Sequence, residues 1–260
     1  MGIVNVTPDS FSDGGRHFSA HGAVERGWQL LEEGADILDI GGESTRPGSA
    51  GVSADEELDR VMPALEGLFG CGVPLSVDTM KPAVMQAALA AGADMINDVR
   101  ALREPGALRM VAESNAAVCL MHMQGEPRTM QQAPRYHDVV AEVKDFLRER
   151  VRAALEAGIV RERLVVDPGF GFGKSLGHNL ELLRRLGEFA DLKLPLLAGL
   201  SRKSMIGALT GAPVEERVHG SVAAALLAVQ RGARIVRVHD VKATREALAV
   251  LAAVEGDNHD

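Results

Sequence analysis

The sequence is divided by eight short apolar runs that recur at nearly regular intervals. Their first residues run from position 2 to position 235, so the seven intervals average about 33 residues. A strand, a loop, a helix and a second loop together need about 30 residues or more. The runs are apolar almost throughout, as expected for parallel strands that are covered on both faces. They are Gly2–Val6, Asp36–Ile40, Val73–Val77, Met95–Val99, Ala116–Met121, Leu164–Val166, Leu194–Leu200 and Ile235–Val238.

The segments between these runs have the apolar spacing that is typical of amphipathic helices. Three helix-to-strand junctions contain a glycine, which can take the left-handed conformation that ends a helix. These junctions are Gly34-Ala35-Asp36, Gly92-Ala93-Asp94 and Gly232-Ala233-Arg234. Eight strands that alternate with helices favour an α/β fold with one (β/α)8 TIM barrel, a fold that typically takes about 250 residues. We therefore expect one domain over residues 1–260, with a doubly wound parallel sheet as the alternative.

The composition argues against several classes of protein. Net charge is −8, with one Trp and one Tyr, so the basic face and stacking aromatics of nucleic-acid binders are lacking. No apolar run approaches the roughly 18 residues that a membrane span needs. The first ten residues, MGIVNVTPDS, lack the features of a signal peptide. Cys71 and Cys119 have no metal-binding spacing, and two isolated thiols suit a reducing compartment. We expect a cytoplasmic protein with no membrane or nucleic-acid partner.

Polar side chains end nearly every apolar run. Any one of them could be a structural cap, but barrel enzymes build their sites at the carboxyl ends of the strands. Unpaired charges buried inside a barrel would cost several kcal/mol each, on the order of transfer energies. We therefore expect these residues to form one polar basin at one end of the barrel. They are Asn5, Asp39, Ser76, Asp78, Asn97, Asp98, His122, Asp167, Ser201, Arg202, Lys203, Arg237 and His239.

Two loops after the first two runs are longer than simple connections. Thr7–Arg16 and Gly41–Gly51 are rich in Gly, Ser and Thr, with Asp in the first of them, and we expect both to be mobile lids. Gly169–Ser175 suggests a phosphate-binding P-loop, but Pro168 stands where the first glycine is required. Its glycines are expected to let the backbone approach a flat ligand. No histidine spacing predicts a zinc site, and we expect His219 to pack on a helix rather than to be catalytic.

In chain order, these strand ends resemble the dihydropteroate synthase family. The matching segments are MGIVNVTPDSFSDGG, DIGGESTRPG, SVDT, INDV, DPGFGFGK, LSRKSMIG and RVHDV, and they span Met1 to Val241. The resemblance implies a transferase that joins para-aminobenzoate to 6-hydroxymethyl-7,8-dihydropterin diphosphate. The products would be 7,8-dihydropteroate and diphosphate, in folate biosynthesis. It also implies a homodimer and a site that sulfonamides enter as mimics of para-aminobenzoate.

Members of the family usually have residues before the first strand, whereas this sequence begins at it. That part would cover the bottom of the barrel. We expect its absence to affect stability more than chemistry.

The resemblance implies roles for the residues that would hold the pterin. Asp167 would accept hydrogen bonds from the aminopyrimidinone edge, and Asn97 would read the neighbouring ring positions. Asp78 would add a further contact, and Lys203 one to a ring nitrogen or carbonyl. Apolar contacts are implied for Met121 and Phe172.

The resemblance also implies an anion site for the diphosphate at Asn5, Arg237 and His239, with Thr45 nearby. Mg²⁺ is implied as the partner of the diphosphate, with Asn5 as its protein ligand, since Mg²⁺ commonly combines few protein oxygens with phosphates and water. The enzyme would orient the substrates and stabilise separating charge rather than supply a nucleophile. The residues expected to be catalytic in this sense are Lys203, Arg237 and Asp78.

For para-aminobenzoate, the resemblance implies that Ser201 binds the carboxylate. Phe11 and Arg46 lie on the two long loops and would close over the substrate. The residues implied to flank its ring are Thr45, Pro47, Phe172 and Lys203.

Two alternatives remain open. A pterin-binding methyltransferase module would not require the SRKS and RVHDV segments, although it would share Asp39, Asp78, Asn97 and Asp167. A non-catalytic relative that only binds pterin would be expected to have lost Asn5, Lys203 or Arg237, and all three are present.

Overall fold

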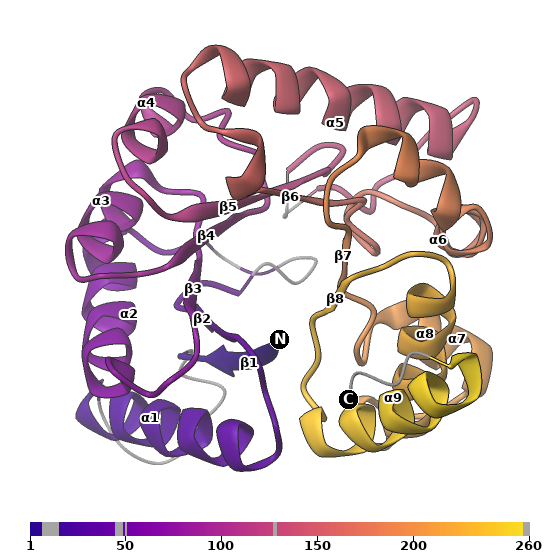
Figure 1. The fold of residues 1–260 in the computed structure, drawn as a ribbon, viewed down its shortest axis with the longest axis horizontal. Coiled ribbons are helices and arrows are strands. Elements are labelled where there is room, and N and C mark those ends of the chain that lie inside the picture. Colours follow the sequence, from indigo (N-terminus) through magenta and orange to yellow (C-terminus); the bar gives the residue numbers. More distant parts are fainter. Residues whose placement is uncertain (7–15, 45–48, 50, 127–128, 257–260) are drawn as a thin grey trace.

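The computed structural model describes residues 1–6, 16–44, 49, 51–126 and 129–256, without the side chains of residues 16–19. Strands and helices alternate along this part of the chain. The strands form a central ring and the helices surround it (Figure 1). This arrangement confirms the predicted α/β fold.

All eight predicted runs contain a strand. The last two strands are much shorter than their runs, since β7 and β8 have two residues each. The strands are β1 (Gly2–Asn5), β2 (Leu38–Gly41), β3 (Leu75–Asp78), β4 (Met95–Asp98), β5 (Ala117–Met121), β6 (Leu164–Asp167), β7 (Leu197–Ala198) and β8 (Ile235–Val236).

Every strand pair is parallel, and single bridges complete the ring. The strands form a six-stranded sheet in the order β1 to β6 and a two-stranded sheet of β7 and β8. A bridge between Val166 and Leu196 joins the sheets on one side, and a bridge between Gly2 and Val238 joins them on the other. At the second junction the Ile3 N–H donates to Val238 O at 3.0 Å. The fold is therefore the predicted (β/α)8 barrel rather than an open sheet.

Helices follow the strands in alternation, with one additional short helix after β7. The α-helices are α1 (Arg16–Glu32), α2 (Ala54–Leu68), α3 (Pro82–Ala90), α4 (Ala107–Ala112), α5 (Val139–Glu156), α6 (Leu176–Arg184), α7 (Ser204–Thr210), α8 (Val218–Gln230) and α9 (Val241–Glu255). Short 3₁₀ helices are η2 (Arg161–Arg163), η3 (Leu186–Leu192) and η4 (Val214–Glu216).

The predicted glycine junctions are confirmed. Gly34, Gly92 and Gly232 have φ angles of 93°, 92° and 98°, which are left-handed. Each lies just past the end of a helix, where a side chain would be strained.

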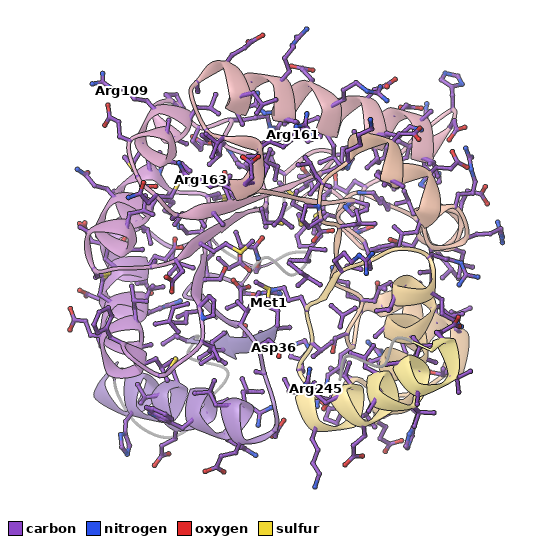
Figure 2. The ribbon with its side chains drawn as sticks, in the orientation of Figure 1. Met1, Asp36, Arg109, Arg161, Arg163 and Arg245 are labelled. Carbon is purple, nitrogen blue, oxygen red and sulfur yellow. The ribbon has the colours of Figure 1, made fainter. Side chains whose placement is uncertain are left out.

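The strands lie between two apolar layers, one outside the barrel and one inside it. The larger layer lies between the strands and the helices and includes Val4, Ile40 and Val77. The smaller one fills the barrel at the amino ends of the strands, where Met1 lies at the centre of the ring (Figure 2). The Met1 α-amino group donates to Val236 O at 3.0 Å, so it adds to the contact between β1 and β8.

Two further features bear on the predictions. No helix in the described part of the chain is long and apolar enough to cross a membrane. His219 lies on α8 as expected, but it is exposed rather than packed, so that prediction is wrong. Its neighbour Ser221 takes the inward position on this helix and is buried.

The crossing of α1 and α2 provides a test of the packing. A Cβ on Gly27 would lie 2.6 Å from Cδ2 of buried Leu68, so Gly27→Ala forces that side chain to move. We expect a net loss of about 1 kcal/mol in the free energy of unfolding, because overpacking costs about 1–3 kcal/mol and the gain in helix propensity offsets part of it. The control is Gly177→Ala in α6, where a Cβ would meet Ser175 Oγ at an ordinary 3.8 Å. That variant should gain about 0.5–1 kcal/mol. Urea denaturation measures both, and equal stability of the two variants would contradict the packing.

Candidate functional site

Inside the barrel a polar layer lies on an apolar one. The apolar layer consists of Met1, Ile37, Met95, Ala117, Cys119, Val165, Leu197 and Ile235. Side chains two residues further along a strand point the same way. Two residues beyond members of that layer, on β2, β4 and β6 and just after β8, come Asp39, Asn97, Asp167 and Arg237. The period of the strand therefore directs these polar groups toward the open, carboxyl end of the barrel.

Arg237 joins the polar groups of three other strands. Its Nε donates to Asp39 Oδ2 at 2.5 Å, and its Nη2 donates to Asp78 Oδ2 at 2.8 Å. Asn97 Nδ2 donates to the same Asp39 oxygen at 3.1 Å. Asp39 is fully buried, and its Oδ1 has no hydrogen-bond partner among the described residues. The network therefore presents one unsatisfied buried acceptor.

Charge and burial compete in this network. Burial acts to lower the pKa of Arg237, but Asp39 and Asp78 raise it above its usual value, so the guanidinium stays charged. Burial raises the pKa of Asp78 to about 7; Arg237 opposes this rise and Asp39 adds to it. Asp78 therefore exchanges a proton near neutral pH.

A second polar group lies at the ends of β6 and β7. Asp167 Oδ1 accepts the backbone N–H of Gly169 at 2.7 Å, and burial raises the pKa of Asp167 against the charge of Lys203. Lys203 Nζ donates to Phe170 O at 2.5 Å and lies 4.7 Å from the centre of the Phe172 ring. Burial lowers the pKa of Lys203 to about 8, while Asp167 opposes this shift.

Residues 168–174 form a glycine-rich loop that packs tightly on the loop after β5. Gly169 has a φ of 69°, and a Cβ there would lie 1.9 Å from His122 O. Gly173 has a φ of 63°, and a Cβ there would lie 2.3 Å from Gln124 O. The predicted close approach of backbone exists, but at these positions it is to the chain's own backbone rather than to a ligand.

An apolar wall adjoins the polar layer. Met121 is buried beside two further methionines and Val99, and Phe172 packs against them. Methionine side chains adapt to irregular and flat apolar surfaces. The structure thus brings the predicted Met121 and Phe172 together. The wall is made of Met80, Val99, Met121, Met123, Met130 and Phe172.

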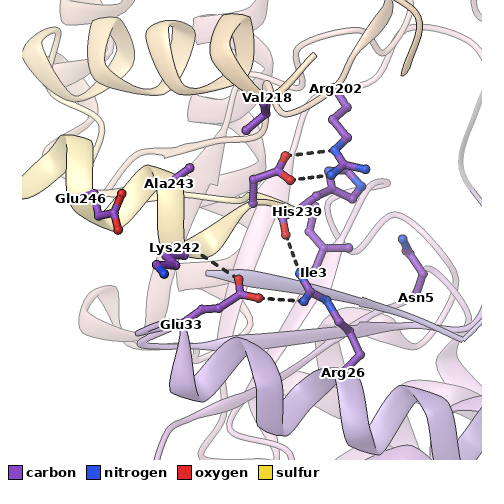
Figure 3. Close-up of a pocket in the computed structure, with 11 residues that line it drawn as sticks. Ile3, Asn5, Arg26, Glu33, Arg202, Val218, His239, Lys242, Ala243 and Glu246 are labelled. Carbon is purple, nitrogen blue, oxygen red and sulfur yellow. Dashed lines mark hydrogen bonds and ion pairs between the residues drawn. The ribbon is translucent and has the colours of Figure 1, made fainter. Parts of the chain in front are cut away.

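Ser201, His239 and Asn5 lie together at the ends of β7, β8 and β1. Ser201 Oγ is 2.9 Å from His239 Nδ1, and it accepts the His239 backbone N–H at 3.2 Å. Asn5 and His239 line a cavity of about 690 Å³ (Figure 3). The cavity lies next to the bridge that joins Gly2 of β1 to Val238, the residue before His239.

The outer wall of the cavity is built from ion pairs (Figure 3). Arg26 Nη1 donates to Glu33 Oε1 at 2.9 Å, and its Nη2 donates to His239 O at 2.8 Å. Arg202 Nε donates to Asp240 Oδ2 at 3.0 Å. These pairs hold the charges of both arginines within the wall.

Several predicted site residues lie outside the described residues. They are Phe11, Thr45, Arg46 and Pro47. Residues 7–15 of the first loop lie outside as well, so the expectation that the two long loops are mobile lids remains a prediction.

The base of the second loop is held by a buried ion-pair cluster that sequence reasoning missed. Lys81 Nζ donates to Glu43 Oε2 at 2.5 Å and to an oxygen of Glu57, which is fully buried. Arg60 Nη1 donates to Gly42 O at 2.8 Å. A signal for this cluster was available, because Glu57 falls on the buried face of α2 among apolar residues.

Comparisons with known proteins agree with this geometry. A family model described as pterin binding enzyme matches residues 1–239. The dihydropteroate synthase of Escherichia coli strain K12 is 55% identical over 254 residues, which cover 97% of this chain and 90% of that relative.

Solved structures are similar over the same span. Xanthomonas albilineans dihydropteroate synthase with 4-aminobenzoic acid has a TM-score of 0.93 at 60% identity, covering 98% of this chain and 92% of that chain. The Xanthomonas albilineans enzyme in complex with 7,8-dihydropteroate has a TM-score of 0.87 at 55% identity, with the same coverage.

The chain therefore belongs to the pterin-binding enzymes. Its relatives also decide between the alternatives that the sequence left open. Its activity is dihydropteroate synthesis, a transferase reaction, rather than methyl transfer or pterin binding alone.

The pKa of Lys203 predicts that this activity falls at alkaline pH. Its pKa is about 8, so the ammonium that can donate to a ligand is lost as pH rises through that value. We expect kcat/KM for the pterin diphosphate to fall above about pH 8, by up to about tenfold per pH unit. Lys203→Met should lower activity and abolish this alkaline limb.

The control is Lys144→Met, because Lys144 forms an ion pair with Asp191 on the outside of the barrel. It should keep the profile of the unchanged protein. A profile for the unchanged protein that stays flat to about pH 10 would contradict the assignment.

Proposed function

We propose that residues 1–260 form one pterin-binding barrel domain that condenses 6-hydroxymethyl-7,8-dihydropterin diphosphate with para-aminobenzoate at the carboxyl ends of its strands. One observation carries this proposal. Asp39, Asn97, Asp167 and Arg237 form a polar layer on an apolar floor, beside a wall of methionines. The edge of a flat, polar-edged ring could hydrogen-bond to the polar layer, and its faces could pack against the apolar side chains.

The pterin would lie in this basin. Asp167 offers carboxylate oxygens to the donors of the aminopyrimidinone edge, and Asn97 offers both a donor and an acceptor to the next ring positions. Asp78 and Lys203 approach from neighbouring strands and supply further polar contacts. Met121 supports the ring through apolar contact.

The diphosphate would lie toward β1 and β8. Arg237 supplies charge, and Asn5 and His239 line the adjoining cavity. In the imidazolium form of His239, Nδ1–H donates to Ser201 Oγ and Nε2–H can donate to an anion, which leaves the Ser201 hydroxyl proton for the carboxylate of para-aminobenzoate. This supports one continuous path for the diphosphate from the basin into the cavity.

Magnesium is part of the proposal, with Asn5 as its protein ligand. Among the described residues, no group of three or more His, Cys, Asp or Glu side chains could hold a metal ion. A cation held by one amide oxygen, phosphate oxygens and water fits the residues at this position. When bound, it would neutralise charge on the diphosphate.

Para-aminobenzoate would bind beside the pterin. Ser201 is placed to bond its carboxylate, and Phe172 and Lys203 to contact its ring. The loop residues that we propose to complete this pocket are Phe11, Thr45, Arg46 and Pro47.

The reaction needs orientation and stabilisation of charge. The bond between the exocyclic methylene and the diphosphate oxygen breaks, the aromatic amine forms the new C–N bond, and the amine loses a proton. Arg237 stabilises the departing diphosphate, and one charge at 4 Å contributes about 4 kcal/mol at an effective dielectric of about 20. Asp78 and Lys203 hold the pterin while positive charge develops on the methylene. These three residues are the proposed catalytic groups.

Release of diphosphate tests the proposed function. The purified chain should release diphosphate only when both the pterin diphosphate and para-aminobenzoate are present, and should form dihydropteroate in equal amount. Release that is independent of para-aminobenzoate would contradict the proposal.

Asp167→Asn tests the pterin site. The amide keeps one acceptor and loses the charge, so we expect the Kd for the pterin to rise about tenfold to a hundredfold, the equivalent of one charged hydrogen bond. The control is Asp191→Asn, because Asp191 is an exposed partner of Lys144. Calorimetry that finds unchanged affinity in folded Asp167→Asn would remove Asp167 from the site.

A homodimer is also proposed, through the face formed by α7, α8 and α9, which lie side by side (Figure 1). Exposed apolar side chains gather there: Leu209, Leu227, Val250 and Val254. Exposed apolar side chains on neighbouring helices are a feature of protein interfaces. The proposed setting is the cytoplasm, with small molecules rather than nucleic acids as ligands, in keeping with the net charge of −8.

Light scattering after gel filtration tests this interface. The double substitution Val250→Lys and Val254→Lys should convert a dimer into a monomer, because it places two positive charges on the face that the dimer would bury. The control is Val160→Lys, which adds one charge at an exposed apolar position after α5. A monomer in the unchanged protein, or a dimer that survives the double substitution, would contradict the proposal.

A further inference from the structure

Lys174 is buried at the end of the glycine-rich loop and takes no direct part in the site described above. Its side chain is 2% exposed, and no described carboxylate forms an ion pair with it. Its Nζ donates to Gly169 O at 2.9 Å and to Phe172 O at 3.0 Å, and it lies 2.9 Å from His122 Nδ1. Two backbone carbonyls of the loop therefore converge on Lys174 Nζ.

This nitrogen is satisfied in either protonation state. An ammonium donates to all three partners, and a neutral amine donates to the two carbonyls and accepts from an Nδ1–H. Burial lowers the pKa of Lys174 well below its usual value, and burial together with Lys174 lowers the pKa of His122 to about 2. The imidazole is therefore neutral, and it bonds to Lys174 without charge repulsion.

The loop needs such a central contact because its backbone is intrinsically loose. Gly169, Gly171 and Gly173 all have positive φ angles, and glycine loses more conformational entropy on folding than any other residue. Further bonds come from outside the loop: Asn179 Oδ1 accepts the Gly171 N–H at 2.7 Å, and Tyr136 Oη donates to Gly173 O at 2.9 Å. Lys174 alone binds two carbonyls of the loop from within.

Those same loop residues hold three features of the substrate site. The Gly169 N–H donates to Asp167, Phe170 O accepts from Lys203, and the Phe172 ring lies under the Lys203 ammonium. Movement of the loop would displace all three at once. Contacts of this kind lose strength steeply when donor and acceptor shift by a fraction of an ångström.

We infer that Lys174 is a positioning residue for substrate binding: it fixes the loop of residues 168–174 and so sets Asp167, Lys203 and Phe172 for the pterin and para-aminobenzoate. The inference rests on the proposed function, because its effect is measured on those substrates. Turnover by the unchanged protein tests the function, and only the variants test Lys174.

Lys174→Met tests this inference, since it keeps most of the side-chain volume and removes the nitrogen. At a temperature where circular dichroism finds the variant folded, KM and Kd for the pterin diphosphate should rise about tenfold or more, as for loss of well-placed polar contacts. The kcat at saturation should fall as well, because the loop also positions Lys203, one of the proposed catalytic groups. Lys144→Met is the matched control and should leave all three values unchanged.

A purely structural role predicts a different result. The melting temperature would fall while KM and Kd stay within about twofold, and that outcome would overturn the inference. An equal rise in KM for Lys144→Met would also overturn it.

Tyr136→Phe provides the answer if Lys174→Met does not fold, because it removes only the hydroxyl that donates to Gly173 O. We expect a smaller rise in pterin KM, about twofold to fivefold, in line with one neutral hydrogen bond. An unchanged KM in this variant would overturn the inference.

Discussion

The contact of one half-buried guanidinium with two carboxylates organises both the barrel and its site. Arg237 comes directly after the last strand of the chain, and its partners Asp39 and Asp78 come from the second and third strands. Either carboxylate without this partner would carry an uncompensated buried charge, at a cost of roughly 3–5 kcal/mol. The pair brings β8 against the early strands at the end of the barrel where β1 and β8 share only one bridge. The same groups keep polar atoms inside the barrel for a ligand to use.

The position of the site follows from two properties of the strands. Alternation along each strand places polar side chains two residues beyond an apolar layer, so the basin has an apolar floor and a polar rim. Next to the bridge between Gly2 and Val238, Asn5 and His239 line a cavity. A ligand that combines a flat ring with an anionic tail matches this shape, with the ring in the basin and the tail in the cavity. In the proposed binding mode, the ring and the diphosphate would therefore occupy separate parts of the barrel end.

The sequence predicted the fold well because strand and helix periodicity are local properties, and all eight apolar runs contain a strand. The polar strand ends also pointed to residues that the structure brings together, such as Asp39, Asp78 and Arg237, while their roles toward substrates remain predictions. The sequence did not predict that Asp39 and Arg237 are partners, because that contact joins residues 198 positions apart. The burial of Lys174 was not predicted either, since it depends on how two loops fold against each other. The roles given to Phe11, Thr45, Arg46 and Pro47 remain predictions.

The central claim is that Arg237 serves the polar layer and the diphosphate together. Equilibrium binding of two ligands to folded Arg237→Met tests it most directly: a pterin without phosphate groups, and the pterin diphosphate. Both should bind more weakly than to the unchanged protein. The substitution leaves Asp39 and Asp78 without their partner, which affects both ligands, and it also removes the guanidinium that would bind the diphosphate. The loss should be larger for the diphosphate ligand. Unchanged affinity for the pterin without phosphates would show that Arg237 only binds an anion, and would contradict the account.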